Sequence, residues 1–240
     1  MKSKFLAIIL SLILTLCLAF PACAETALLE TVYQLPKDNV NFALDPSLDY
    51  LVIGQHQPIS DDFRATVEKH MAIIPNDVDG DLTGVELATY SAYTLLRRDL
   101  LVNYGIEIGL YDGYRTLADH QWLIDVGAIS PDSVPVGYSE HHTGLLLNIV
   151  VKIGDYYYNE LAVLTDDTLP EEVRASTAFQ TLRTVAIDYG FITRFPEGKE
   201  SLTGSPYNPN EFRFVGSKEV AHAIMDNHLC LEEYVATLAP

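Results

Sequence analysis

The sequence contains few cysteines. Cys17 and Cys23 lie in the apolar N-terminal segment, and Cys230 is the third and last. If that segment is removed, one thiol remains, and one thiol cannot form an intramolecular disulfide. The folded part of the chain must therefore depend on an apolar core, in which we expect Cys230 to be a small buried hydrophobe.

Basic residues are scarce as well. The 15 Lys and Arg residues are outnumbered by 33 Asp and Glu residues, which gives a formal net charge of −18. Such an acidic surface repels phosphate backbones and anionic lipid headgroups. We therefore expect no nucleic-acid partner and no attachment to a membrane surface, and we expect the protein to be a monomer.

Long apolar runs are confined to the N-terminus. The basic start MKSK precedes an apolar run at residues 5–20, and the sequence ACA then ends at Ala24. This pattern predicts a secretory signal peptide at residues 1–24, with cleavage after Ala24. Lipidation of Cys23 is the less favoured alternative, because the preceding FPA is a poor lipidation signal. We expect a secreted protein, extracellular or associated with the cell wall.

The rest of the chain reads as one domain. No repeat, low-complexity tract or Pro/Gly/Ser-rich linker divides it. We expect a polar N-terminal arm at residues 25–49 and a single domain at residues 50–240. Helical and strand patterns are mixed without regular βαβ alternation, which favours an α+β domain with a central, mostly antiparallel sheet flanked by helices.

Local signals place the elements of this domain. Ser60 is a predicted helix N-cap, Thr83 and Glu86 form a predicted capping box, and Gly105 is expected to end the same helix. The predicted helices cover residues 60–71, 83–104, 117–127, 170–189, 217–229 and 231–239. The predicted strands cover residues 50–54, 106–115, 144–151, 191–195 and 211–216.

Three segments in order carry a family resemblance. They are YDGYRT at residues 111–116, SEHHTGLLLNI at 139–149, and YGFITRFPEGKESLTG with NPNEFRFVG within 189–216. Together they resemble the VanY-like D-alanyl-D-alanine carboxypeptidases, zinc peptidases of the hedgehog/DD-peptidase fold. The resemblance extends from about Tyr50 to near the C-terminus. It implies that fold, a zinc cofactor and peptidoglycan stem peptides, from which the family removes the terminal D-alanine.

The resemblance also implies three metal ligands and a general base, and most of these are replaced. The family motif Ser-x-His-x-x-Gly-x-x-x-Asp retains Ser139 and His141 but has Asn148 at the aspartate position. The motif Glu-x-x-His aligns with NPNE, which puts Asn208 at the general-base position and Glu211 at the second histidine. Only His141 is retained among the ligands.

These replacements predict weak or absent zinc binding. An amide oxygen such as that of Asn148 is not among the usual zinc ligands. Compared with the family's ligands, one aspartate is lost and one glutamate is gained, so the summed charge of the ligands is unchanged. Electrostatics therefore does not exclude a metal ion. A larger share of oxygen ligands would favour a harder metal than zinc. Asn208 cannot accept a proton, and losing a general base costs a factor of ~10²–10⁴ in rate. Glu197 and Glu200 lie nearby but are not expected to replace it.

Two hypotheses follow for function. The first is a catalytically impaired relative, or pseudoenzyme, that recognises stem peptides through the retained cleft or works as a scaffold or regulator. The alternative is an active metallo-carboxypeptidase with an unusual ligand set, in which His142 or a nearby acid substitutes for a missing group. In either case the resemblance implies that Arg115 contacts the substrate, and we expect Ser139 and Gln121 to take part in substrate binding. We expect the remaining candidates to be structural: Arg194 and Arg213 as scaffold residues, and His70, His120, His222 and His228 as surface or edge residues.

Overall fold

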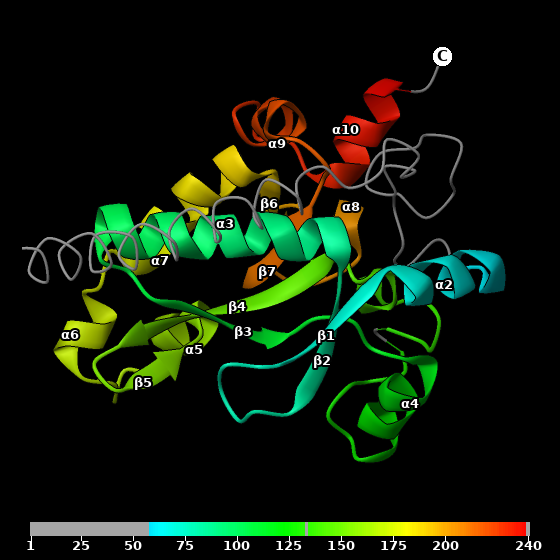
Figure 1. Cartoon of the computed structure of the whole chain (residues 1–240), viewed down its shortest axis with the longest axis horizontal. Coiled ribbons are helices and arrows are strands. Elements are labelled where there is room, and N and C mark those ends of the chain that lie inside the picture. Colours follow the sequence, from blue (N-terminus) through cyan, green and yellow to red (C-terminus); the bar gives the residue numbers. More distant parts are fainter. Residues whose placement is uncertain (1–57, 133, 239–240) are drawn as a thin grey trace, which may run out of the picture. The chain divides into compact units, whose positions relative to one another are not determined.

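The computed structural model describes residues 58–132 and 134–238 (Figure 1). The predicted signal peptide, the N-terminal arm at residues 25–49 and the predicted strand at residues 50–54 lie outside the described residues. Within the described ranges, no helix combines the length and the apolar character needed to cross a bilayer.

An antiparallel sheet forms the centre of the described region. Its order is β3 (Ile108–Asp112), β4 (Leu146–Ile153), β7 (Asn208–Phe214) and β6 (Phe191–Phe195), and β5 (Tyr156–Tyr158) also pairs with β4. Every pairing is antiparallel. Figure 1 shows helices packed around this sheet, so the predicted α+β fold with a central antiparallel sheet is confirmed.

The main core lies between the sheet and α3 (Leu87–Tyr104), which crosses it in Figure 1. On β4, Leu147, Ile149 and Val151 are fully or almost fully buried in this core. Burying each such side chain contributes ~1.5–3 kcal/mol. Because side chains alternate along a strand, Asn148 points to the opposite face of the sheet, where the candidate site lies.

The other helices surround the sheet and its loops. Their bounds are α2 (Asp61–Val67), α4 (Leu117–Asp125), α5 (Glu160–Thr165), α6 (Glu171–Arg174), α7 (Ala178–Ala186), α8 (Glu200–Thr203), α9 (Lys218–Met225) and α10 (Leu231–Leu238). Short 3-10 turns occur at η1 (Glu68–His70), η2 (Glu140–Thr143) and η3 (Ile187–Tyr189).

A separate hairpin corrects one prediction. β1 (Met71–Pro75) pairs with β2 (Leu82–Glu86), so Thr83 lies in a strand and does not cap a helix. Its hydroxyl oxygen instead accepts a hydrogen bond from the Gly113 backbone amide at 3.0 Å. Helix α3 begins at Leu87, with the Glu86 carboxylate capping it through the Thr89 amide at 2.9 Å.

The helix that begins at Ser60 is shorter than the sequence predicts. The Ser60 hydroxyl accepts from the Phe63 amide as predicted, but the helix ends at Val67, and Met71 already belongs to β1. Gly105 ends α3 in the left-handed conformation, as predicted.

The single helix predicted at residues 170–189 is broken into α6, α7 and η3. The break lies at Ser176, whose hydroxyl accepts a hydrogen bond from the Ala178 amide and so competes with helical backbone bonding. Gly190 closes the segment at φ +78°, as the sequence predicted.

Candidate functional site

A cavity of about 450 Å³ opens beside the ends of β4, β6 and β7. Five of the residues singled out from the sequence line it: Arg115, Ser139, His141, Asn208 and Glu211. They come from the segment after β3, from the start of η2 and from β7. The sheet thus brings together residues that are as many as 96 positions apart in the chain.

Strand pairing aligns the three positions that correspond to family metal ligands. Asn148 on β4 lies directly opposite Glu211 on β7. His141 reaches the same point from η2, with its Nε2 3.8 Å from the Glu211 carboxylate. His141 and Glu211 line the cavity here, whereas Asn148 lies beside Glu211 in the sheet and is not among the residues that line the cavity. We call these three side chains the acceptor corner.

The hydrogen bonds of His141 determine which ring nitrogen faces this corner. Its Nδ1 lies 2.6 Å from the Gly113 carbonyl oxygen, and a carbonyl only accepts, so Nδ1 carries the hydrogen. In the neutral ring Nε2 then presents a lone pair toward Glu211. The backbone passes close here: a Cβ on Gly113 would lie 2.4 Å from the Gly84 carbonyl oxygen, so only glycine fits.

Asn148 adds an unpaired acceptor. Its Oδ1 is buried and has no hydrogen-bond partner among the described residues. Leaving a buried polar atom unsatisfied costs ~1–3 kcal/mol. The acceptor corner therefore joins an imidazole nitrogen, a carboxylate and an amide oxygen, and each of them can accept a hydrogen bond or bind a cation.

This set does not fit the zinc site of the family motifs. The described ranges hold no cluster of three or more His, Cys, Asp or Glu side chains able to bind a metal ion. Two ligands of a tetrahedral zinc, each ~2.0–2.1 Å from the ion, lie roughly 3.4 Å apart. His141 Nε2 and the Glu211 carboxylate are 3.8 Å apart, which is close to this separation, but the third donor is an amide oxygen, which is not among the usual zinc ligands.

Asn208, at the general-base position, is held by a neighbouring amide. Its Oδ1 accepts hydrogen bonds from the Asn210 backbone amide at 3.1 Å and from the Asn210 side chain at 3.3 Å. These bonds engage the only acceptor atom of the Asn208 side chain. An amide oxygen in this state cannot remove a proton from a water molecule.

Arg115 lines the cavity, and its charge is balanced. Its guanidinium forms an ion pair with Asp112 and approaches His120 Nδ1 at 3.4 Å. Burial raises the pKa of Asp112, but the neighbouring His141 and Arg115 outweigh this and bring the pKa below its ordinary value. Asp112 therefore remains a carboxylate that positions Arg115.

Two neighbouring histidines, His120 and His142, are fully buried. His120, predicted at a surface or edge, is fully buried, and its Nε2 donates to the Val134 carbonyl oxygen at 2.9 Å. It packs edge-on against His142. Burial lowers the pKa of both rings, that of His142 to about 4. A helical pattern alone did not show that α4 turns His120 inward.

Gln121, which we expect to take part in substrate binding, lies outside the cavity. It lies on the exposed side of α4, where its amide donates to Asp125 at 2.8 Å, and it does not line the cavity. Consecutive residues of a helix point in different directions, so the inward position of its neighbour His120 turns Gln121 to solvent.

A buried ion network supports the turn that carries His141. Glu140 forms ion pairs with Arg194 at 2.5 Å and with Arg213 at 3.4 Å, and Arg194 also binds Glu232 on α10. Both arginines are fully buried, as expected of scaffold residues, and Cys230 is buried as predicted. Sequence reasoning missed Glu140, because its partners lie more than 50 residues away.

Comparisons with known proteins point to one family. A family model described as VanY, D-alanyl-D-alanine carboxypeptidase, matches residues 88–217. The putative carboxypeptidase YodJ of Bacillus subtilis is 34% identical over 138 residues, which are 54% of this chain and 46% of YodJ. The D-Ala-D-Ala dipeptidase and carboxypeptidase VanXYC of Enterococcus gallinarum is 32% identical over 140 residues, 55% of this chain and 68% of VanXYC. The chain thus spans about half the length of YodJ.

Solved structures share the fold. The LD-carboxypeptidase LdcB is 25% identical with a TM-score of 0.54, covering 69% of this chain and 76% of LdcB. The D,D-dipeptidase VanXYg, solved with a D-Ala-D-Ala phosphinate analog, is 21% identical with a TM-score of 0.57, covering 81% and 72%. A mutant of the D,D-pentapeptidase VanY, solved with Zn(II), is 22% identical with a TM-score of 0.53, covering 77% and 97%. The family match, the shared fold and the aligned motif positions establish that the chain belongs to the VanY family of D-alanyl-D-alanine carboxypeptidases.

Proposed function

We propose that this protein is a secreted, catalytically impaired VanY-family member that binds peptidoglycan stem peptides without hydrolysing them efficiently. The observation that carries the proposal is Asn208. It occupies the general-base position in the cavity, and its only acceptor atom is engaged by Asn210. The altered acceptor corner adds a second, independent loss, because its donors do not fit zinc.

Glu211 does not replace the missing base. It lies on β7 opposite Asn148, at the position of a metal ligand. Hydrolysis by this family's chemistry needs a metal-activated water as well as a proton acceptor. With the zinc ligands replaced, a carboxylate at Glu211 has no activated water to deprotonate.

The parts of the cavity that could hold a peptide are retained. Arg115 and Ser139 line it, together with the apolar or aromatic side chains of Tyr138, Leu161 and Phe195. A pocket with apolar walls and a few polar groups is typical of a small-ligand site. Relatives such as VanXYC act on D-Ala-D-Ala, which supports stem peptides as the ligand class. The signal-peptide pattern at residues 1–24 supports a location outside the cytoplasm, where such peptides occur.

The test measures D-alanine release and peptide binding on the same preparation. Purified protein is supplied with zinc or manganese and a stem pentapeptide ending in D-Ala-D-Ala, with VanXYC as the active reference. We expect no release above background, together with saturable binding of the pentapeptide by calorimetry. Clear metal-dependent turnover would establish the alternative, an active metallo-carboxypeptidase with an unusual ligand set.

A further inference from the structure

We propose that His120 is a positioning residue of the cavity: its ring, anchored to the cavity wall at Val134, fixes the orientation of the Arg115 guanidinium. The inference rests on the proposed function, since it takes Arg115 to be a group that contacts the bound peptide. It goes beyond that function by naming the residue that determines how Arg115 is presented to a ligand.

The first observation is that His120 belongs to the cavity and is completely buried. It is the buried residue of helix α4, whereas the next residue along the chain, Gln121, is exposed. Both ring nitrogens of His120 have hydrogen-bond partners. The ring is therefore held in one orientation, and its role follows from these two contacts.

The second observation is the tautomer that the two partners require. His120 Nε2 lies 2.9 Å from the Val134 carbonyl oxygen, which can only accept, so Nε2 carries the hydrogen. Arg115 Nη1 lies 3.4 Å from His120 Nδ1 and can only donate, so Nδ1 presents its lone pair. Both contacts thus need the same neutral ring, and burial favours that state because it lowers the pKa of His120.

The third observation is that His120 and Asp112 hold the guanidinium together. Asp112 forms an ion pair with Arg115 Nη2, while His120 accepts from Nη1. A guanidinium is planar, so contacts at two different nitrogens fix both its place and the plane in which it lies. The other N–H donors of Arg115 can therefore meet a ligand in the cavity in one defined orientation.

The fourth observation is a second link between the same two segments. His142 Nδ1 donates to the Arg115 carbonyl oxygen at 2.7 Å, and its Nε2 accepts from the Gly137 amide at 3.2 Å. The rings of His142 and His120 meet edge-on, with their centroids 5.3 Å apart. The side chain of Arg115 and its backbone are therefore both joined to residues 134–137, each through one histidine ring.

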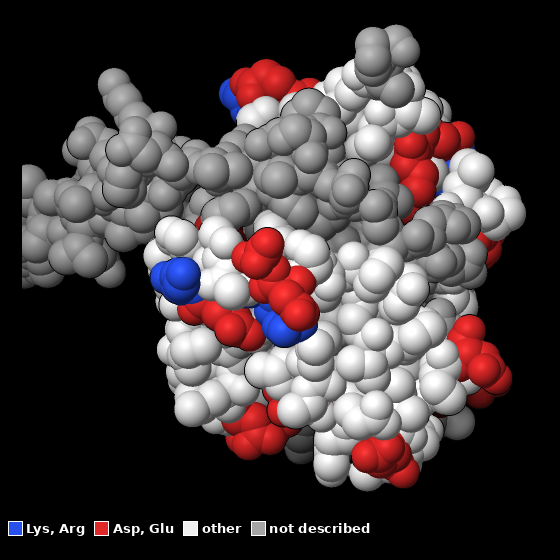
Figure 2. Space-filling model, turned by 90° about the vertical axis from the view of Figure 1, so that its right-hand side faces the viewer, with Lys and Arg blue, Asp and Glu red and all other residues white. Residues whose placement is uncertain are grey.

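The consequence for binding follows from the charge of the cavity. Within the part of the chain that the structure describes, Arg115 is the one Lys or Arg that lines the cavity. The whole chain carries a net charge of −18, and acidic side chains cover more of the described surface in Figure 2 than basic ones do. A peptide therefore finds its main cationic donor at Arg115, and the orientation of that group determines how strongly carbonyl or carboxylate oxygens are bound.

Two substitutions separate the two contacts of His120. In His120→Asn, the side-chain oxygen can take the place of Nδ1 and accept from Arg115, but the donor to the Val134 carbonyl oxygen is lost. In His120→Gln, the side-chain nitrogen can take the place of Nε2 and donate to Val134, but the acceptor beside Arg115 is lost. A positioning role makes the second variant the more damaging one for binding.

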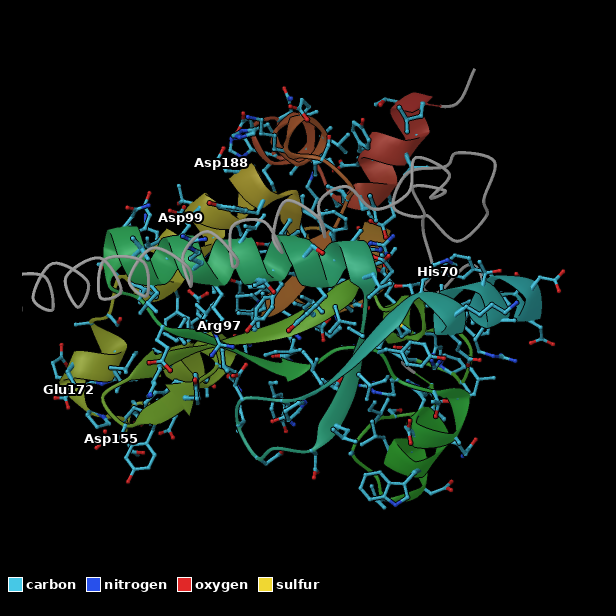
Figure 3. All side chains as sticks on the ribbon, viewed as in Figure 1. His70, Arg97, Asp99, Asp155, Glu172 and Asp188 are labelled. Carbon is cyan, nitrogen blue, oxygen red and sulfur yellow. The ribbon has the colours of Figure 1, made fainter. Side chains whose placement is uncertain are left out.

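Calorimetry measures this difference with a stem pentapeptide ending in D-Ala-D-Ala. The protein without its predicted signal peptide is titrated in EDTA, so that no metal-dependent cleavage occurs. We expect His120→Gln to weaken binding about 3- to 10-fold, which corresponds to one lost hydrogen bond, and His120→Asn to weaken it less than about 2-fold. The control His70→Gln makes the same change on η1, outside the cavity, at a histidine labelled in Figure 3; it should leave the affinity unchanged.

NMR of the protein without peptide gives a second readout, which does not depend on a ligand. Nitrogen chemical shifts of the His120 ring should show a hydrogen on Nε2 and none on Nδ1. The Arg115 Nε–Hε signal, assigned by its loss in Arg115→Lys, should move in His120→Gln and stay near its native position in His120→Asn. The shifts of the native ring keep the proposal testable if His120→Gln folds poorly.

Four results would overturn the proposal: a hydrogen on Nδ1 of His120 in the native protein, an unchanged Arg115 signal in His120→Gln, equal affinities of the Asn and Gln variants, or a weaker affinity of the Asn variant. If the native protein binds the pentapeptide and one of these results is found, the positioning role is wrong and the peptide-binding function stands. If the native protein does not bind the pentapeptide, the proposed function fails, and the NMR signals alone decide whether His120 orients Arg115.

Discussion

At the scale of single residues, the cavity combines a retained histidine with replaced partners. His141 is held as a metal-binding histidine would be, with Nδ1 donating to a backbone carbonyl and Nε2 facing the cavity. Opposite it, however, are Glu211 and Asn148, whose donors do not complete a zinc site. Asn208 removes the proton acceptor. The backbone hydrogen bond that orients His141 is therefore present, although the residues beside His141 differ from the family's metal ligands.

Restoring the family residues should rebuild that set. The triple variant Asn148→Asp, Asn208→Glu and Glu211→His should bind zinc stoichiometrically, measured by elemental analysis after gel filtration without chelator. It should also gain D-alanine release, because Arg115 and the cavity wall are in place. Each single reversion should do little, since ligands and base act as a unit. Stoichiometric zinc in the unmodified protein, lost on replacing His141, would contradict this.

The neutral state of His142 predicts a pH dependence of stability. Its Nδ1 donates to the Arg115 carbonyl oxygen at 2.7 Å, and its Nε2 accepts from the Gly137 amide at 3.2 Å, so protonation breaks the second bond. Burial lowers the pKa of His142 to about 4. The pKa of histidine in an unfolded chain is ~6.5. Between that pH and the lower folded pKa, the unfolded chain binds more protons than the folded one. The unfolding free energy therefore falls as pH falls through this range, by at most ~1.4 kcal/mol per pH unit.

This contribution is measured by comparison with His142→Gln. Denaturant unfolding of both proteins at pH 7, 6 and 5 gives the difference in unfolding free energy at each pH. We expect the advantage of the native protein over the variant to shrink steadily from pH 7 to pH 5. A constant advantage would show that folding does not lower the pKa of His142, and an advantage that grows as pH falls would show that folding raises it.

At the scale of elements, the pairing of β4 with β7 creates the site, and the sequence could predict this. The family motifs fix which residue of each strand faces the cavity, and the register places Asn148 opposite Glu211. The β1–β2 hairpin could not be predicted, because Thr83 and Glu86 have the spacing of a capping box, and only pairing with β1 shows Thr83 to be in a strand. The inward position of His120 depends likewise on its contact with Val134.

The network around Glu140 ties η2 to β6, β7 and α10, and its removal should be costly. Glu140→Gln keeps the shape but leaves the buried Arg194 and Arg213 with less compensating charge. Breaking a buried ion pair in this way costs ~3–5 kcal/mol. Chemical denaturation should show a loss of this order. The control Glu171→Gln breaks an exposed ion pair with Arg174 and should lower the free energy of unfolding by at most ~1 kcal/mol. Similar losses of unfolding free energy in the two variants would refute a special role for the network.

At the scale of the whole molecule, the VanY-family domain has a cavity and buried structural supports, and we propose that its hydrolytic groups are replaced. The core beneath the sheet and the ion network around Glu140 support the fold. Under the proposed function, the role of the protein depends on what the cavity binds. The prediction that catalytic groups are lost rests on the sequence alone, because it depends only on residue identities at positions that match the family motifs. The unpaired Asn148 oxygen became visible only through the packing around it.

The central claim is that stem peptides bind in this cavity and are released without being cleaved. The most direct measurement is a single-turnover experiment, with the protein in excess over a stem pentapeptide and with zinc or manganese added, followed by mass spectrometry of the recovered peptide. The account predicts that bound peptide is recovered as the intact pentapeptide, whichever metal is present. Recovery of the tetrapeptide in an amount that depends on the metal, and on His141, would contradict it.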